Sequence, residues 1–133
     1  MAGTIVADTI QDGAGNSTSM DNAIYGSAKA WVSFVGSTAV VRGSYNVSSI
    51  TRVSLGVFTV NMTNALSNAN YAYTVGASPS SGYGANPGAI VCNANGTTST
   101  LITPTTSAFT FTIYNLGASN YLDPLQCNVI VLD

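Results

Sequence analysis

The chain has few side chains that could carry out acid–base or nucleophilic catalysis. Its 133 residues include three Lys or Arg and five acidic residues, all of them Asp, and they include no His and no Glu. Acid–base catalysis near neutral pH usually needs a His or a carboxylate with a raised pKa. A Ser or Cys nucleophile would lack an evident base, and nothing around Lys29 indicates a Ser–Lys pair. The sequence therefore predicts a non-enzymatic protein without catalytic residues.

The residues that could bind metal are equally sparse. The segment 12–17, DGAGNS, has part of a calcium-loop pattern but lacks the alternating acidic ligands and the closing Glu, so we interpret it as a polar turn. Cys92 and Cys127 are distant in sequence and, without His, do not form a zinc site. They are either cross-strand neighbours that oxidise after lysis or buried side chains that stay reduced. We expect no metal and no cofactor.

Trp31 is the first candidate for a binding role. It alternates out of phase with the apolar residues of its segment, so it should lie on the opposite face of a strand, beside Lys29. An outward Trp near a cation is typical of a contact between subunits. We predict such a contact from Lys29, Trp31 and Arg42. The alternatives are a stacking platform for a sugar and coverage of Trp31 by a strand of a second sheet.

Two loops provide further candidate ligand residues. Residues 77–88 are rich in Pro and Gly and carry Tyr83, whereas residues 115–124 carry Tyr121 and Asp123. A Tyr on a Gly-rich loop offers contact area and a hydroxyl group at small entropic cost. The alternative is that each Tyr folds back onto the sheet as a lid.

These residues must be positioned by strands, because apolar side chains recur at every second position and no segment has helical periodicity over ten or more residues. Short strand spacing of this kind predicts an all-β chain with a single antiparallel β-sandwich, jelly-roll-like in connectivity, over residues 26–133. We expect strands near 28–35, 38–45, 50–55, 57–61, 71–77, 89–92, 98–103, 109–114 and 127–132.

Residues 1–25 differ from the rest and are predicted to form an extended arm and linker. One short strand is expected within 3–10, followed by a polar run over 11–22, and three of the five acidic residues lie in the arm. A lone strand cannot bury its own apolar face, so it must dock on the domain or pair with something outside it. We therefore predict an assembly arm; the alternative is a disordered leader. Its candidate contact residues are Thr4, Ile5, Val6, Asp8 and Ile10.

Charge is the most unusual property of the composition. Only 6% of residues are charged, against about 25% in ordinary domains, and the net charge is −2. Because low charge favours association, we expect an oligomer; the alternative is a monomer hydrated by Ser, Thr, Asn and Gly. No basic stripe is present for nucleic acid. No apolar run suits membrane insertion or a signal peptide, so we expect synthesis in a cytoplasm.

Several segments resemble a small β-rich module of fibre-like virion proteins from tailed bacteriophages, including phages of cyanobacteria. They are 26–34 (GSAKAWVSF), 44–51 (SYNVSSIT), 58–60 (FTV) and 69–71 (ANY), with a similar lead-in at 3–13 (GTIVADTIQDG). The resemblance covers about residues 3–75. It implies a non-enzymatic homotrimer located in the virion.

The chain departs from that family pattern in two respects. We expect it to lack a fibre shaft or a larger anchoring domain, and 51–56 (TRVSLG) replaces an Asp- and Gly-rich turn. The resulting expectation is a trimeric capsid-decorating (cement) or fibre-tip module that is attached to other virion proteins through its N-terminal arm. The alternative function is a tail-fibre module that binds a host-surface glycan receptor.

Overall fold

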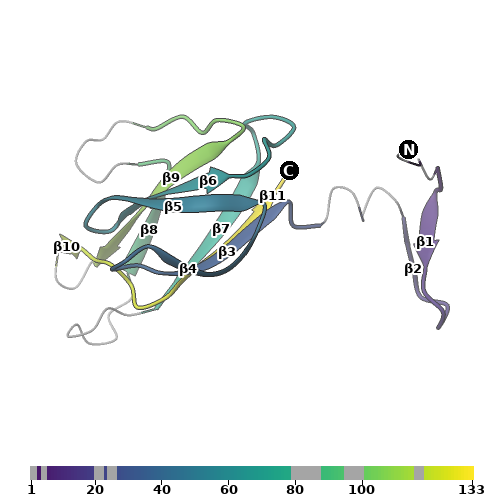
Figure 1. Ribbon diagram of the computed structural model, residues 1–133, viewed down its shortest axis with the longest axis horizontal. Coiled ribbons are helices and arrows are strands. Elements are labelled where there is room, and N and C mark those ends of the chain that lie inside the picture. The colour runs from purple at the N-terminus through teal and green to yellow at the C-terminus, as the bar shows by residue number, and fades with distance from the viewer. Residues whose placement is uncertain are drawn as a thin grey trace.

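The elements whose bounds the structure describes are all strands, and every pairing between them is antiparallel (Figure 1). The computed structural model describes Gly3, 6–19, Ala23, 27–78, 88–94, 101–115 and 119–133; the side chains of Thr18 and 88–92 are not described. The strands are β1 (Thr9–Gln11), β2 (Ser17–Ser19), β3 (Ala30–Val35), β4 (Val40–Tyr45), β5 (Val47–Ser54), β6 (Val57–Met62), β7 (Ala72–Ala77), β8 (Gly88–Cys92), β9 (Ala108–Asn115), β10 (Asn120–Tyr121) and β11 (Cys127–Leu132).

The nine strands from β3 to β11 form two sheets. One has the order β4-β3-β11-β7, and the other has the order β10-β9-β6-β5, with β8 also paired to β9. The all-β prediction is confirmed, and eight of the nine expected strands match β3 to β9 and β11 within a few residues. The ninth, near 98–103, falls partly outside the described residues; Leu101 forms only an isolated bridge to Ala94, and 102–105 are irregular.

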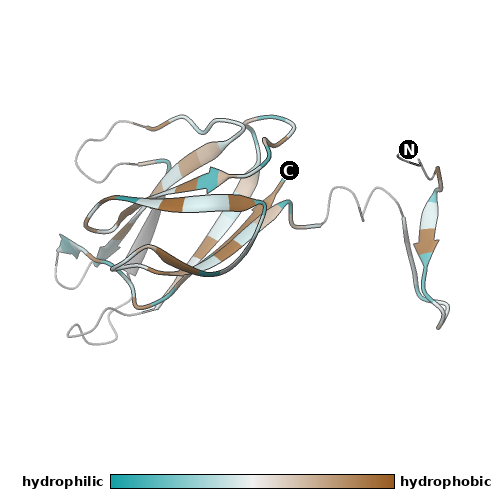
Figure 2. Cartoon of the chain, in the orientation of Figure 1, coloured by the Kyte–Doolittle hydropathy of each residue, from teal (hydrophilic) through white to brown (hydrophobic). Residues whose placement is uncertain are grey.

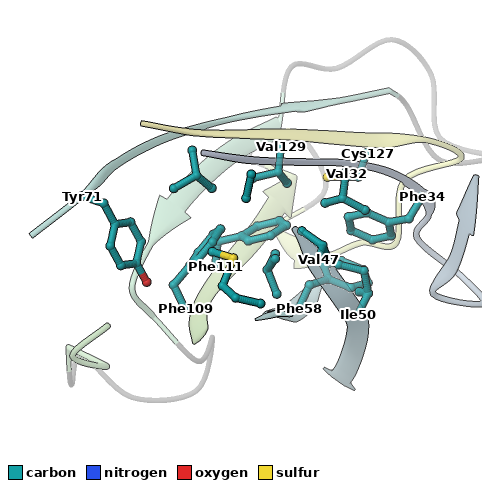
Figure 3. Packing of buried hydrophobic residues seen from close by; sticks show 14 of the residues in the cluster. Val32, Phe34, Val47, Ile50, Phe58, Tyr71, Phe109, Phe111, Cys127 and Val129 are labelled. Atoms are coloured by element: carbon teal, nitrogen blue, oxygen red, sulfur yellow. The ribbon is translucent and has the colours of Figure 1, made fainter. Parts of the chain in front are cut away.

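A single hydrophobic core lies between the two larger sheets, which gives a sandwich-like arrangement (Figure 3). Phe34 of β3 meets Phe58 of β6 edge to face, with ring centroids 5.3 Å apart, and Phe58 lies 5.8 Å from Phe111 of β9. All three side chains are fully buried. Burying one such side chain contributes about 1.5–3 kcal/mol, so these aromatic contacts tie the sheets together.

Polar side chains in this core and on the sheet directly behind it form hydrogen bonds. The hydroxyl of Tyr71 donates to the carbonyl oxygens of Thr105 (2.9 Å) and Ala108 (3.2 Å), and burial raises the pKa of Tyr71 to about 12. On the opposite face of the five-stranded sheet, Thr59 and Thr110 share a 2.8 Å hydrogen bond between their hydroxyls. A buried polar group is tolerated when it is paired in this way.

One residue, Asn46, connects β4 of the four-stranded sheet to β5 of the five-stranded sheet. Asn46 has φ = 54°, a left-handed conformation that Asn accepts more readily than most residues. Its side-chain amide donates to the carbonyl oxygen of Lys29 (3.1 Å), and its side-chain oxygen accepts from the backbone N–H of Asn64 (2.8 Å). This side chain therefore fixes the corner between β4 and β5.

The N-terminal residues form a hairpin instead of the single strand that the sequence predicted. β1 and β2 pair with each other and with neither larger sheet, so the predicted polar linker 11–22 contains a strand (Figure 1). The turn between them is organised by Asp12, whose side chain accepts from the backbone N–H groups of Ala14 and Asn16, both at 2.9 Å. Hydrogen bonds from Asn16 lower the pKa of Asp12. The interpretation of 12–17 as a polar turn fits this geometry.

Candidate functional site

The outer face of the four-stranded sheet carries a row of exposed apolar side chains. Along β3 the side chains alternate between buried and exposed, so Trp31 points away from the core, as predicted. Across the sheet, Trp31 lies opposite Tyr45 of β4 on one side and Ile130 of β11 on the other. The exposed fractions are 42% for Trp31, 59% for Tyr45 and 46% for Ile130. We call these three residues, with the exposed Leu132 two positions after Ile130, the Trp31 face.

A glycine helps to position the indole ring of Trp31. Gly43 of β4 lies diagonally across from Trp31, and a Cβ atom built at Gly43 would stand 3.5 Å from two atoms of the ring. The ring therefore covers the place where β4 has no side chain, an arrangement that stabilises glycine in a strand near a sheet edge. Figure 2 shows the alternating hydrophilic and hydrophobic bands that run along these strands.

Polar groups border the Trp31 face on the side of the β3–β4 turn. Arg42 donates to the side-chain oxygen of Gln126 at 3.1 Å. The amide of Gln126 donates in turn to Ser33 (3.4 Å) and Asn128 (3.2 Å). An apolar centre beside a polar, hydrogen-bonding margin is the usual anatomy of a protein interface.

The structure brings the three predicted subunit-contact residues to one sheet. Lys29 directly precedes β3, where its backbone N–H donates to the carbonyl oxygen of Val131 and its ammonium donates to Ser27 at 3.2 Å. Trp31 follows two residues later, and Arg42 lies on the neighbouring strand β4. All three lie on or beside the face that points away from the core, which is the geometry that a subunit contact requires.

Asp123, a predicted ligand residue, serves as a structural connection in this fold. Its carboxylate accepts from Arg52 Nε at 2.8 Å and Nη2 at 2.7 Å, and from the backbone N–H of Gly56 at 2.9 Å. These bonds join the β5–β6 turn to the segment before β11, and the Asp123 side chain is only 9% exposed. The carboxylate is therefore occupied by groups of the protein itself.

Tyr121, the other predicted ligand residue of that loop, lies in β10 of the five-stranded sheet. Its ring meets Tyr114 edge to face at 5.1 Å, and both side chains are half-buried. The contact is a cross-strand pair within the sheet, because Tyr121 lies in β10 directly opposite Tyr114 of β9. Tyr83 lies outside the described residues, as do Thr4 and Ile5 of the predicted assembly arm. The remaining arm residues Val6, Asp8 and Ile10 are exposed.

Reactive groups do not gather at any point in the described part of the chain. Cys127 is a free thiol, fully buried, and burial raises its pKa to about 12, so its nucleophilic thiolate does not form near neutral pH. Among the same residues no three His, Cys, Asp or Glu side chains lie together as metal ligands. The Trp31 face is thus the strongest candidate for a functional site, and its chemistry is that of binding.

Tyr45, Ile130 and Leu132 belong to the Trp31 face but were missed by the sequence analysis. The run Val129-Ile130-Val131-Leu132 is apolar throughout, so alternation alone did not reveal which side of β11 faces the core. A usable signal was available nevertheless, because four consecutive apolar residues in a strand must place two of them on each face.

No protein-family model, curated protein or solved structure matches this chain. Within the described residues, no helix has the length and apolar character needed to cross a membrane.

Proposed function

We propose that the protein is a non-enzymatic structural component of a virion, a homotrimeric capsid-decorating (cement) or fibre-tip module. In this proposal the β-sandwich of residues 26–133 associates with its copies. The arm of residues 1–25 holds each copy in the assembly, which also contains other virion proteins. The resemblance of about residues 3–75 to phage fibre modules supports the virion location. The jelly-roll-like description of the sandwich remains a prediction, and the in-sheet hairpins β3–β4 and β5–β6 count against it.

The observation that carries the proposal is the Trp31 face. Ile130, Trp31 and Tyr45 are exposed on three adjacent strands, and the registers place them side by side. Soluble monomers rarely expose large contiguous apolar patches, and such a patch with a polar margin marks an interaction site. The low charge of the chain, 6% of residues, offers little electrostatic repulsion against self-association.

Light scattering on the purified chain tests the proposal. The monomer mass is 13.6 kDa, so a trimer should give 3 × 13.6 = 40.8 kDa. Trp31→Ser should shift the mass towards the monomer, because an interfacial Trp commonly contributes about 2 kcal/mol or more to binding. Val53→Ser is the matched control, since Val53 is an exposed apolar residue on β5 of the other sheet. A Trp31→Ser protein with the mass of an intact trimer would remove the basis of the proposal.

Glycan binding is the second candidate function, and one observation favours it. Trp31 and Tyr45 are adjacent exposed aromatic side chains, and Arg42 and Gln126 lie next to them with polar groups. Aromatic rings that stack on a sugar, with hydrogen-bonding groups at the margin, suit a host-surface glycan. A glycan array with the wild type, Trp31→Ser and Tyr83→Ala would show which platform binds, and an array without signal would leave the structural role alone.

A further inference from the structure

The β1–β2 hairpin has no hydrophobic core of its own. Each strand has three residues, the whole of β1 is exposed, and the hairpin pairs with neither larger sheet. Ile10 is 49% exposed, and Val6, just before β1, is 94% exposed. An isolated two-stranded hairpin is marginally stable in water, so this element needs a surface that covers its apolar residues. Figure 2 shows the hydrophobic band on β1.

The arm and the sandwich carry opposite net charge. Residues 1–25 contain three Asp and no Lys or Arg, which gives −3. Residues 26–133 contain three cations and two Asp, which gives 3 − 2 = +1, and the two parts sum to the net charge of −2. Such complementarity favours contact between an arm and a sandwich.

The cations of the sandwich are not evenly placed with respect to the Trp31 face. Arg52 is engaged with Asp123 at the β5–β6 turn. The other two cations lie at the four-stranded sheet. Lys29 directly precedes β3, which carries Trp31, and Arg42 lies on β4, which carries Tyr45. The partner of the Arg42 guanidinium is the neutral amide of Gln126. The border of the apolar row therefore has Arg42 at one place and Lys29, with the Asp133 carboxylate in its neighbourhood, at another, whereas the exposed hairpin is apolar and acidic.

We propose that the β1–β2 hairpin of one copy docks on the Trp31 face of a second copy. Val6 and Ile10 pack against Trp31 and Ile130, and the carboxylate of Asp8 lies towards Arg42. This inference rests on the proposed function and identifies the occupant of the face. Each copy then offers one arm and one face, a head-to-tail contact that closes into a ring when the rotation between copies permits.

Charge reversal in the whole chain tests this docking of one copy's hairpin on another copy's Trp31 face, which we call the exchange. Self-association is measured by analytical ultracentrifugation. Asp8→Lys and Arg42→Asp should each weaken association by about tenfold, since attraction becomes repulsion at a contact that apolar burial otherwise stabilises. The double variant should recover most of that loss. An equimolar mixture of the two single variants should associate more tightly than either one alone. Ser54→Lys, at an exposed site on β5, is the charge control and should behave as wild type.

The outcomes separate this inference from the proposed function. If Trp31→Ser dissociates the oligomer while Asp8→Lys and Ile10→Ser leave it intact, the face binds something other than the arm, and the exchange is overturned while the proposed function stands. If Trp31→Ser leaves the oligomer intact, the Trp31 face does not mediate association. That result overturns the arm–face contact and removes the observation on which the proposed function rests. A wild-type monomer would overturn the exchange, because an arm that covers its own face gives no intermolecular contact. Circular dichroism of each variant establishes that the sandwich remains folded.

Discussion

Removal of the Asp123 carboxylate should destabilise the fold even though the residue lies near the surface. The carboxylate accepts from two nitrogens of Arg52 and from the backbone N–H of Gly56, with distances between 2.7 and 2.9 Å. Gly56 is buried. Asp123→Ala therefore leaves a buried N–H group without its acceptor and also breaks the only ion pair formed among the described residues.

The magnitude follows from which of these contacts each variant loses. An unsatisfied buried donor costs about 1–3 kcal/mol, whereas a partly exposed ion pair contributes about 0–1 kcal/mol. We expect Asp123→Ala to lower the free energy of unfolding by about 2–3 kcal/mol. Asp123→Asn keeps an oxygen for the Gly56 N–H and should lose about 1 kcal/mol. Arg52→Ala removes the ion pair alone and should lose less than about 1 kcal/mol.

Urea denaturation followed by circular dichroism, at one fixed protein concentration, measures these differences. A fixed concentration is needed because oligomerisation contributes to apparent stability. Ser54→Ala is the control, since Ser54 is an exposed side chain on β5 outside the Trp31 face and its removal should leave the stability of the sandwich within about 0.5 kcal/mol of the wild type. The reasoning is refuted if Asp123→Ala is as stable as the wild type or if Arg52→Ala costs as much as Asp123→Ala.

Three further outcomes are expected from the local geometry. Gly56 has φ = 71°, and an added Cβ would lie 2.6 Å from a backbone oxygen of β9. Gly56→Ala should therefore lower the free energy of unfolding, measured by urea denaturation, by more than about 1 kcal/mol. Gly76→Ala is the control and should be nearly neutral, because an added Cβ there would have no atom within 4 Å. Burial raises the pKa of Cys127 from 9.0 to about 12, so its contribution to stability is complete below pH 9.0 and is lost as the pH rises towards 12; Cys127→Ala should show a shallower alkaline decline. Hydrogen bonds from Ser67 lower the pKa of Asp133 below 3.8, so their contribution is present above that pH and is lost in acid. Ser67→Ala should therefore be less stable than the wild type near neutral pH but not in strong acid.

The sequence was sufficient to predict those parts of the fold that depend on local alternation. Ala30, Val32 and Phe34 are buried and Trp31 is exposed, as period-two spacing requires when one face of a strand meets a core. The prediction was weaker where every residue of a strand is apolar. In β11 it did not distinguish Val129, which is buried, from Ile130, which is exposed.

Contacts between residues distant in sequence were not predictable from local pattern. Asp123 accepts from Arg52, 71 positions away, and nothing in the segment 119–126 identifies that partner, so the residue was interpreted as a ligand residue. The arm was misjudged for a related reason. Its second strand, Ser17–Ser19, is a polar triplet without alternation, and it becomes a strand because the Asp12 turn directs it back along β1.

Trp31 is the only tryptophan of the chain, so its fluorescence reports directly on the face that is proposed to mediate assembly. Emission wavelength and acrylamide quenching should be measured over a dilution series, in parallel with the molecular mass. If copies associate through the Trp31 face, the emission should shift to shorter wavelength and quenching should fall as the mass rises from the monomer value of 13.6 kDa, because the 42% exposed indole becomes covered. A rise in mass with unchanged emission and unchanged quenching would contradict assembly through this face.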